Sequence, residues 1–427
     1  MLSGLTFSQY DYDLVIVGAG AAGLFCSAMI AELFPKGLRV LLIEKTATIG
    51  NKLLLSGNGQ CNYTHAGDMK DFSGHYGENY GFLKPALHSL SNTMLMKFFE
   101  ELGVKSLTRD DLKVFPASLK AEEIRDALSR HSGKYPVEIK TSHELTDITY
   151  SEDGMVLAVN NSLIKAKYLI LCTGGASYPE TGSAGDIARL LKGVKIKSFK
   201  PALSVPVLKL QAHSNANISE LAGISYHKAT VSVWRLDKKL FDKTGSLLFT
   251  HKGLSGPLIL DNSRYFKQGD KIVLYLTEYT DLNEFERHFI ALMGKHPKRI
   301  TRNIVSMLKI PESIIEFLAL PIEEGLLDTK AAELSKQGRK SIVKAFFSME
   351  FSVKSLGNIL HAMCSNGGVD LSEINRSTMS LKKYPNIFVA GECIDVDGDT
   401  GGYNIHAAFA TANIIVRHLS NIFSTKE

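Results

Sequence analysis

The chain has 427 residues, of which 44% are hydrophobic and 22% charged, and its formal net charge is +5. This is an ordinary globular composition, and the length predicts two or three domains, or one large domain with an insertion. Basic residues gather at 192–200 and 295–302, but such stretches are typical of solvated surface, so nucleic acid is not the expected partner.

The cysteines and the N-terminal region indicate in which cellular compartment the protein is expected. Five scattered cysteines without a CxxC pair argue against a disulfide framework and against a zinc site, and no other metal-ligand spacing occurs. No signal peptide is recognisable at the N-terminus. Residues 14–34 are apolar, but Gly18, Gly20, Gly23 and Glu32 favour a strand, a turn and a helix over a membrane span. We therefore expect a cytoplasmic protein without membrane contact.

The first recognisable unit spans residues 12–44. A buried strand is predicted at 12–17, the run GAGAAG follows it, a helix is predicted at 24–34, and a second buried strand at 38–43 ends at Glu44. In a dinucleotide fingerprint Gly18 permits the tight turn, Gly20 lets the backbone approach a pyrophosphate, and Gly23 packs the helix on the strand. The helix N-terminus then faces the phosphates, and Glu44 can accept hydrogen bonds from ribose hydroxyls, which disfavours NADP at this site.

A second glycine loop, SGNGQCN at 56–62, follows at once. The fingerprint alone does not distinguish NAD from FAD. FAD is the longer cofactor, and a loop whose two glycines expose backbone N–H groups could run beside its pyrophosphate and flavin. Ser56, Asn58 and Asn62 would add side-chain partners. A turn unrelated to any ligand explains the spacing equally well.

The end of the chain favours the longer cofactor. A buried strand is predicted at 386–390, followed by Gly391, Glu392 and Asp395, then by a Gly-Gly pair and a helix from about Tyr403. In a two-site FAD fold this segment returns to the first domain, with its acidic turn at the ribityl chain and phosphates and its helix start under the flavin pyrimidine. A plain strand–loop–helix pair is the alternative.

These motifs together resemble one family. GAGAAG with Glu44, KLLLSGNGQCN (52–62), YLILCTGGASYPETGSAGD (168–186), LLFTHKGLSGPLIL (247–260) and the run 367–404 are similar, in this order, to the BaiN/YhiN-like bacterial NAD(P)/FAD-dependent oxidoreductases. That family is related to fumarate-reductase-type flavoproteins. The chain has Gln60, His65, His406 and Ala412 where the family commonly has Arg, Asn, Gln and Gly, differences that bear on the substrate more than on FAD.

The resemblance implies an α/β fold: a Rossmann-like FAD domain of the two-dinucleotide-binding (GR2) type with an inserted β-barrel plus helical domain. We expect the FAD domain at 1–197, the insert at 198–363 as a substrate lid, and the C-terminal return segment at 364–427. Within these bounds the pattern predicts an antiparallel meander over 137–171 and helices near 82–90, 93–102, 121–132, 282–293, 298–308 and 331–336.

The resemblance also implies non-covalent FAD and its contacts, with a backbone segment near Leu145 at the adenine and one near Thr173 at the cofactor. The expected FAD-binding residues are Gly18, Gly20, Ala21, Ala22, Gly23, Glu44, Lys45, Lys52, Ser56, Gly57, Gly59, Cys61, Asn62, Leu145, Thr173, Gly174, Gly391, Glu392, Asp395, Gly402, Tyr403 and Asn404.

Three polar side chains could take part in chemistry. His251 and Tyr178 are candidate proton donors to a carbon opposite flavin N5, although a structural hydrogen bond is the more common role for each. Cys61 could be a redox thiolate, but without a neighbouring cysteine we favour structural packing beside FAD. Ser255 lies in GLSGP, where Pro257 and the lack of a strand–helix elbow exclude a hydrolase.

The preferred function is an FAD-dependent oxidoreductase that transfers hydride between flavin N5 and a small molecule, reducing or forming a C=C or C–N bond. No second full GxGxxG occurs, so NAD(P)H could act only as a transient reductant over the flavin. The alternatives are an RNA-modifying flavoprotein, which predicts an insert face rich in Lys and Arg, and a flavin-binding sensor without turnover.

Overall fold

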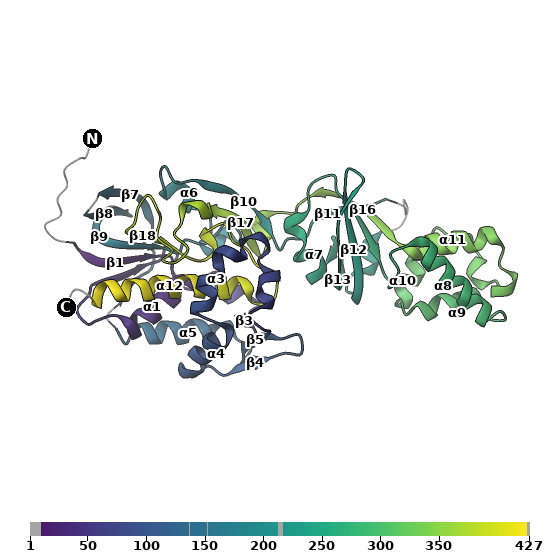
Figure 1. Ribbon diagram of the computed structural model, residues 1–427, viewed down its shortest axis with the longest axis horizontal. Helices are drawn as coiled ribbons and strands as arrows, with labels where there is room; N and C mark the ends of the chain where they lie inside the picture. The colour runs from purple at the N-terminus through teal and green to yellow at the C-terminus, as the bar shows by residue number, and fades with distance from the viewer. Residues whose placement is uncertain (1–9, 136, 152, 212–216, 425–427) are drawn as a thin grey trace. The chain divides into compact units, whose positions relative to one another are not determined.

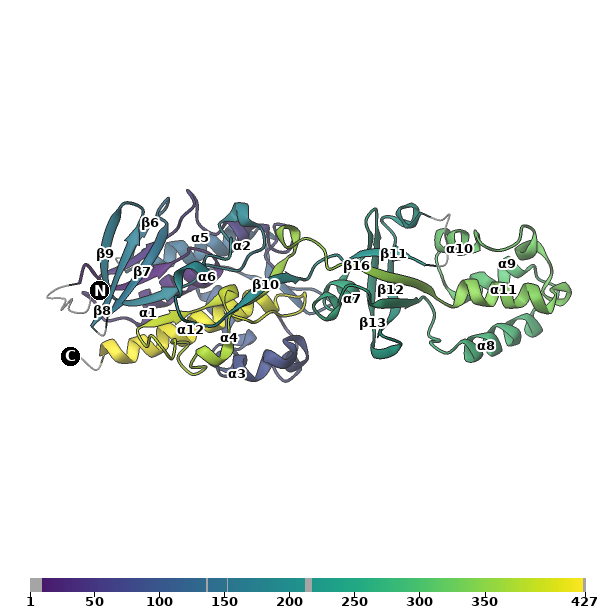
Figure 2. The ribbon, with the colours of Figure 1, turned by 90° about the horizontal axis from the view of Figure 1, so that it is seen from above.

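The computed structural model describes residues 10–135, 137–151, 153–211 and 217–424, and the chain divides into two units (Figures 1 and 2). Unit 1 comprises Met1–Ala202 and Ile359–Glu427, and unit 2 comprises Leu203–Asn358. The segments 1–9, 212–216 and 425–427 of the three expected domains lie outside the described residues. The expected fold class is confirmed: unit 1 is an α/β unit with a largely parallel sheet, and unit 2 combines an antiparallel sheet with helices.

The main sheet of unit 1 has seven strands. Their order is β6 (Val137–Lys140), β2 (Val40–Ile43), β1 (Tyr12–Val17), β9 (Ser162–Leu171), β8 (Gly154–Val159) and β7 (Leu145–Ser151), with β18 (Ile387–Val389) also beside β9. The pairs among β6, β2, β1, β9 and β18 are parallel. The antiparallel meander expected over 137–171 is therefore confirmed only for β7, β8 and β9, because residues 137–140 form β6, which pairs in parallel with β2. All four residues of β2 are buried, as expected for a parallel strand covered on both faces.

Two long helices pack together against this sheet. They are α1 (Ala21–Leu33) and α12 (Tyr403–Ser424), coloured purple and yellow in Figure 1. The C-terminal segment therefore returns to the first strand–helix unit through β18 and α12. The other helices of unit 1 are α2 (Asn51–Leu55), α3 (Tyr80–Ser89), α4 (Asn92–Glu101), α5 (Ala121–Ser132) and α6 (Ile187–Leu190). Its small sheets are β3 (Thr64–His65), β5 (Lys113–Pro116) and β4 (Ser106–Thr108), and the pair β10 (Ile196–Ala202) and β17 (Cys364–Val369).

Unit 2 is built on a six-stranded antiparallel sheet. Its order is β11 (Val207–Leu210), β16 (Met349–Ser355), β15 (Lys271–Tyr275), β12 (Ser225–Arg235), β13 (Lys238–Thr250) and β14 (Gly253–Ser255). The end strands β11 and β14 also contact each other, so the sheet approaches a barrel. The helices are α7 (Pro257–Leu260), α8 (Leu282–Lys295), α9 (Thr301–Val305), α10 (Glu312–Ala319) and α11 (Lys336–Phe347).

One helix prediction in unit 2 was wrong, and another placed the start of the helix too early. The helix expected at 298–308 begins only at Thr301, after the turn that closes on His296, and ends in a 3-10 turn. The segment expected to be helical at 331–336 is a 3-10 turn at Ala331–Glu333, and the true helix begins where the predicted one ended. The side chain of Ser335 sets that start, because it accepts a hydrogen bond from the Gly338 amide and so caps α11.

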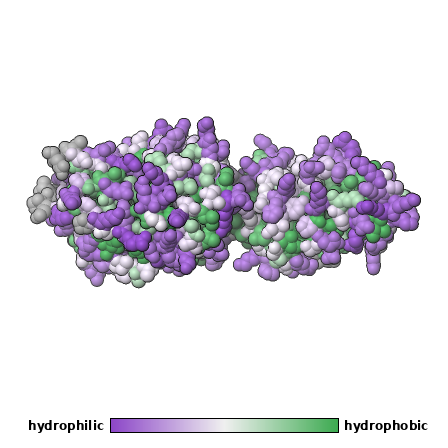
Figure 3. Space-filling model, turned by 90° about the horizontal axis from the view of Figure 1, so that it is seen from below, coloured by the Kyte–Doolittle hydropathy of each residue, from purple (hydrophilic) through white to green (hydrophobic). Residues whose placement is uncertain are grey.

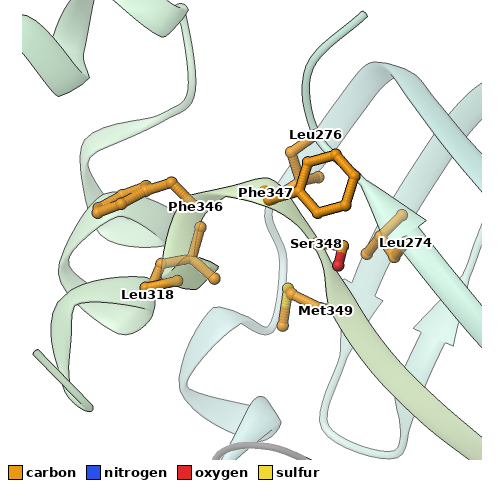
Figure 4. A pocket seen from close by; sticks show the side chains of 8 residues that line it. Leu274, Leu276, Leu318, Phe346, Phe347, Ser348 and Met349 are labelled. Carbon is orange, nitrogen blue, oxygen red and sulfur yellow. The ribbon is translucent and has the colours of Figure 1, made fainter. Parts of the chain in front are cut away.

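A small apolar hollow without room for a water molecule lies where the sheet of unit 2 meets its helices (Figure 4). The residues around it are Leu274, Leu276, Leu318, Ala345, Phe346, Phe347, Ser348 and Met349. Because only Ser348 brings a polar side chain, this hollow is packing space and lacks the convergent polar groups of a reaction site.

Candidate active site

The first glycine loop connects β1 to α1. Gly18 has φ +97°, and a Cβ on it would lie 2.4 Å from the carbonyl oxygen of Cys172. A Cβ on Gly23 would lie 1.9 Å from the carbonyl oxygen of Gly18, so both positions require glycine for packing. A Cβ on Gly20 would meet no heavy atom within 4 Å. The loop is therefore tight against β9 and α1 but open in front of Gly20, where Ala21 and Ala22 begin the helix without a side-chain cap.

The carboxylate of Glu44 lies beside this loop at the end of β2. It is 8% exposed, and it accepts hydrogen bonds from the Ala19 amide at 2.8 Å and from the Thr46 amide and hydroxyl at 2.9 and 2.8 Å. The neighbouring Lys45 forms an ion pair of 2.5 Å with Asp186. The structure thus holds a buried acceptor against the glycine loop, where the fingerprint expects a ribose.

The end of β9 supplies the next wall of the site. Thr173 and Gly174 follow this strand, and the Gly18 Cβ position is 3.4 Å from the Thr173 amide nitrogen. Gly391 approaches from the return segment, because its Cβ would lie 3.1 Å from that of Ala22. Leu145 is buried at the start of β7, and its carbonyl accepts a hydrogen bond from Arg189 at 3.3 Å.

The second glycine loop follows the short helix α2. Gly57, Asn58, Gly59 and Cys61 all have positive φ, and the Ser56 hydroxyl donates back to the Leu53 carbonyl at 2.6 Å. The turn therefore needs its glycines for backbone conformation. Burial raises the pKa of Cys61 to about 12, so its thiol is neutral at physiological pH and cannot serve as a thiolate there.

Several polar atoms around these loops are buried without a hydrogen-bond partner. Within the described part of the chain they include Thr173 Oγ1, Ser183 Oγ and Asn62 Oδ1. The Asn62 amide nitrogen donates to the carbonyls of Thr64 and Val114, so only its oxygen lacks a partner. Because buried polar groups are normally satisfied, such atoms indicate a missing ligand or water.

A polar network joins α2 to the return segment. Lys52 Nζ lies 2.6 Å from Ser177 Oγ and 2.6 Å from Glu392 Oε2. The other oxygen of Glu392 accepts hydrogen bonds from the Ser365 amide at 2.7 Å and hydroxyl at 2.8 Å. Two predicted site residues therefore meet, and two serines complete their network.

The start of α12 packs on the loop region through its backbone. A Cβ on Gly402 would lie 2.6 Å from the Thr64 carbonyl oxygen, so only glycine fits there. The Tyr403 ring is 2% exposed and stacks on His75 with centroids 4.1 Å apart. The Asn404 amide is engaged with the backbone of Gly398 in both directions at 2.8 Å.

Three more residues predicted for the site are Asp395, Tyr178 and His251. Asp395, 3% exposed, is bound to Lys197 at 2.5 Å, so its carboxylate already has a charged partner. Tyr178 is half-buried in unit 1 and has φ +53°, a conformation that strains a non-glycine residue. His251 lies in the exposed turn between β13 and β14 of unit 2, so it is not part of the group of residues that unit 1 brings together.

Sequence reasoning missed four residues of this region: Ser177, Ser183, Ser365 and Asp186. Ser177, Ser183 and Asp186 lie within the motif at 168–186 but received no role from it, and Ser365 lies outside the motifs, so only the folded structure brings these four side chains into the region. The arrangement is that of a nucleotide site at the carboxyl ends of parallel strands, where open α/β sheets bind their ligands.

Among the described residues no group of three or more His, Cys, Asp or Glu side chains could hold a metal ion. None of the described helices has the length and apolar character that crossing a membrane requires.

Comparison with known proteins identifies the class. A family model described as "HI0933-like protein Rossmann domain" matches residues 12–418. A ribosomal RNA dihydrouridine synthase of Haemophilus influenzae is 30% identical, with 95% of this chain and 97% of the relative covered. An Escherichia coli protein of the same name is 27% identical, with 94% and 96% covered. A 3-dehydro-bile acid delta(4,6)-reductase of Clostridium scindens is 25% identical, with 94% and 97% covered.

The fold and the site define a Rossmann-type flavoprotein oxidoreductase. The chain belongs to the HI0933-like family, because the family model matches nearly its whole length. The resemblance noted in the sequence to BaiN/YhiN-like flavoproteins is therefore confirmed, as is the expectation that the protein is an enzyme.

Proposed function

We propose that this protein binds FAD non-covalently in unit 1 and uses it to add hydrogen across a C=C bond conjugated to a carbonyl. The observation that carries the proposal is the open cradle at Gly20, at the uncapped start of α1 and beside the buried Glu44 carboxylate. A helix N-terminus of this kind binds phosphate, and an adjacent carboxylate binds ribose. The unpartnered Thr173 Oγ1, Ser183 Oγ and Asn62 Oδ1 support a polar ligand in the same region.

Each part of the site has a proposed partner on FAD. The α1 start would hold the pyrophosphate, Glu44 the ribose, and Glu392 the ribityl chain, while Lys52 orients Glu392 through its ion pair. The first amides of α12 would face the flavin pyrimidine, where a helix N-terminus stabilises negative charge. FAD, when bound, supplies hydride chemistry at N5.

The chain itself must deliver a proton to the carbon next to the one that receives hydride. Tyr178, which lies in unit 1 with the proposed FAD site, is the preferred donor, and His251 of unit 2 is the second candidate. The left-handed backbone of Tyr178 favours it, since strained non-glycine residues cluster at functional sites. NAD(P)H is the proposed reductant, binding transiently, because the sequence contains one full GxGxxG fingerprint.

The names of the relatives support the reaction class. A delta(4,6)-reductase and a dihydrouridine synthase both saturate a ring C=C bond, one in a bile acid and one in a nucleobase. A small-molecule substrate with an enone is therefore the first candidate, in line with the small-molecule hydride transfer expected from the sequence.

Uridine in ribosomal RNA is a second candidate, and the charge of unit 2 favours it. Leu203–Asn358 contains 22 Lys and Arg against 16 Asp and Glu, a net charge of +6, whereas the remaining residues carry 27 and 28. Among the described ion pairs none involves the exposed Lys295, Lys298 or Arg299, which join α8 to α9. On the face of unit 2 visible in Figure 3, hydrophilic residues are intermixed with neutral and hydrophobic ones. A basic insert is the footprint expected of an RNA-binding unit.

One experiment separates these candidates. The protein is reduced anaerobically with NADH or NADPH and mixed with an unmodified ribosomal RNA transcript, free uridine or a steroid enone. Reoxidation of the flavin, with gain of two hydrogens by one substrate in mass spectra, supports the reductase and names the class. Failure of all C=C acceptors to reoxidise the flavin contradicts it. Replacing Lys295, Lys298 and Arg299 together by Glu should abolish turnover with the RNA transcript but leave turnover with free uridine and the steroid enone unchanged.

A further inference from the structure

Ser183 is a buried serine in the loop between β9 and α6, inside the motif at 168–186 but without a role assigned to it by the sequence. It is 5% exposed, and its hydroxyl oxygen has no hydrogen-bond partner among the described residues. An unpartnered buried hydroxyl costs folding free energy, because it loses its hydrogen bonds to water and gains none in return. A native chain that keeps such a group usually satisfies it with a ligand or an ordered water.

The surroundings of this hydroxyl place it at the nucleotide cradle. A Cβ on Gly174 would lie 2.8 Å from Ser183 Oγ, so the glycine keeps the space before the hydroxyl open. The preceding residue, Gly182, faces the ribose acceptor, because its Cβ would lie 3.5 Å from Glu44 Oε1. Thr173, next to Gly174, has a second unpartnered hydroxyl and lies against Gly18 of the first loop.

We propose that Ser183 binds the adenosine half of FAD, with its hydroxyl donating to a ribose or phosphate oxygen beside Glu44. The contact would come from a loop that follows β9, roughly 160 residues after the fingerprint. It deepens the proposed function and rests on FAD binding in unit 1. Ser183 itself lies against the Gly174 position. Because the adjacent Gly182 lies near Glu44 and the adjacent Thr173 near Gly18, we assign the contact to the adenosine half and not to the flavin half.

The proposal predicts two effects of opposite sign for Ser183→Ala. Without ligand the variant loses only an unsatisfied group, so its melting temperature should equal or exceed that of the wild type. With ligand it loses a hydrogen bond, so the dissociation constant of FAD should rise about threefold to tenfold. ADP, which carries only the adenosine and pyrophosphate, should lose affinity by the same factor.

Ser27→Ala is the matched control. Ser27 is also fully buried, but its hydroxyl donates to the Leu24 carbonyl at 2.8 Å and contacts Ser132 Oγ at 2.7 Å. This variant should lower the melting temperature of the FAD-free protein and leave the affinity for FAD unchanged. The pair therefore distinguishes a ligand-directed serine from a structural one.

The measurements are titrations of FAD-free protein with FAD and with ADP, followed by flavin fluorescence and calorimetry, and thermal unfolding without ligand. Unchanged FAD affinity in Ser183→Ala, or a lowered melting temperature like that of Ser27→Ala, would overturn the proposal. A loss of FAD affinity without loss of ADP affinity would also overturn it, by placing Ser183 at the flavin. If the wild type bound no FAD, the proposed function itself would fail.

Discussion

Lys52 on α2 and Glu392 in the return segment form an ion pair of 2.6 Å across 340 positions of the chain. Their side chains are 23% and 20% exposed, so water screens the pair only in part. Glu392 also accepts a hydrogen bond from the Ser365 amide, so it links α2, which leads into the second glycine loop, to β17 and the C-terminal segment. The pair therefore connects two motifs that the sequence presents separately.

A double-mutant cycle should measure this connection. Lys52→Met, Glu392→Gln and the double variant, each without FAD, should give a coupling free energy of about 1–3 kcal/mol in urea unfolding. The exposed pair Lys97–Glu101 on α4, at 3.6 Å and with 76% and 59% exposure, is the control and should couple by about 0.3–0.5 kcal/mol. Additive effects of Lys52 and Glu392 would show that the pair does not join the segments.

Glu44→Ala should weaken FAD binding about tenfold to hundredfold, because hydrogen bonds to a charged acceptor contribute roughly 1.5–3 kcal/mol. It should also lower the unfolding free energy of the FAD-free protein by about 1–3 kcal/mol, since the Ala19 amide loses its acceptor. Glu138→Ala, on the neighbouring strand β6, should leave FAD affinity unchanged. Equal FAD affinity in the Glu44→Ala variant and the wild type would show that the adenosine of FAD does not bind beside Glu44.

Cys61 should resist alkylation in the native protein at pH 8. The residue is fully buried, and burial raises the pKa of its thiol from 9.0 to about 12, so the reactive thiolate is scarce. Iodoacetamide followed by peptide mass spectrometry should modify Cys61 only after denaturation. Rapid native labelling, or a long-wavelength charge-transfer band in the flavin spectrum, would restore the thiolate hypothesis.

His406 should make the protein sensitive to acid. Its imidazole is fully buried between Thr64 Oγ1 and the Leu90 carbonyl, each at 2.8 Å, and burial lowers its pKa from 6.5 to about 4. A folded-state pKa below the unfolded one gives stability that is complete above pH 6.5 and is lost as pH falls toward 4. The loss from this group should reach about 3 kcal/mol at pH 4.

His406→Gln is the matched variant, since an amide offers one donor and one acceptor without titrating. Its unfolding free energy should depend less on pH between 6.5 and 4 than that of the wild type, by the same amount. Parallel pH profiles for the two proteins would mean that other groups cause the acid sensitivity.

Local signals in the sequence correctly predicted the main strands and helices of unit 1. The run GAGAAG between buried strands fixes β1, α1 and β2, because glycine and apolar periodicity act over a few residues. The second glycine loop and α12 follow from the same kind of signal. The start of α11 was missed because its cap, Ser335, lies inside a polar stretch that gives no apolar period. Helix α10 was not predicted, because the residue before it is Pro311 and no side chain caps its start.

The residues of the candidate site were harder to predict from the sequence than the strands and helices. Gly18, Gly23 and Glu44 belong to one motif, and their packing follows from it. The motif at 168–186 contains Ser177 and Ser183 without indicating a role for either, and Ser365 lies in no motif. Only the folded chain brings Ser177 and Ser365 to Glu392 and places Ser183 by Gly174. Asn404 was expected at the cofactor, yet its side chain braces Gly398, so only its backbone amide remains available for that prediction.

The central claim is that unit 1 binds FAD without a covalent bond. The most direct measurement is the visible spectrum of the purified protein, followed by acid precipitation and mass analysis of the supernatant. The account predicts a yellow protein whose colour leaves entirely with the supernatant as intact FAD. Colour retained in the pellet would contradict the non-covalent attachment, and a colourless protein that takes up no added FAD would contradict the account as a whole.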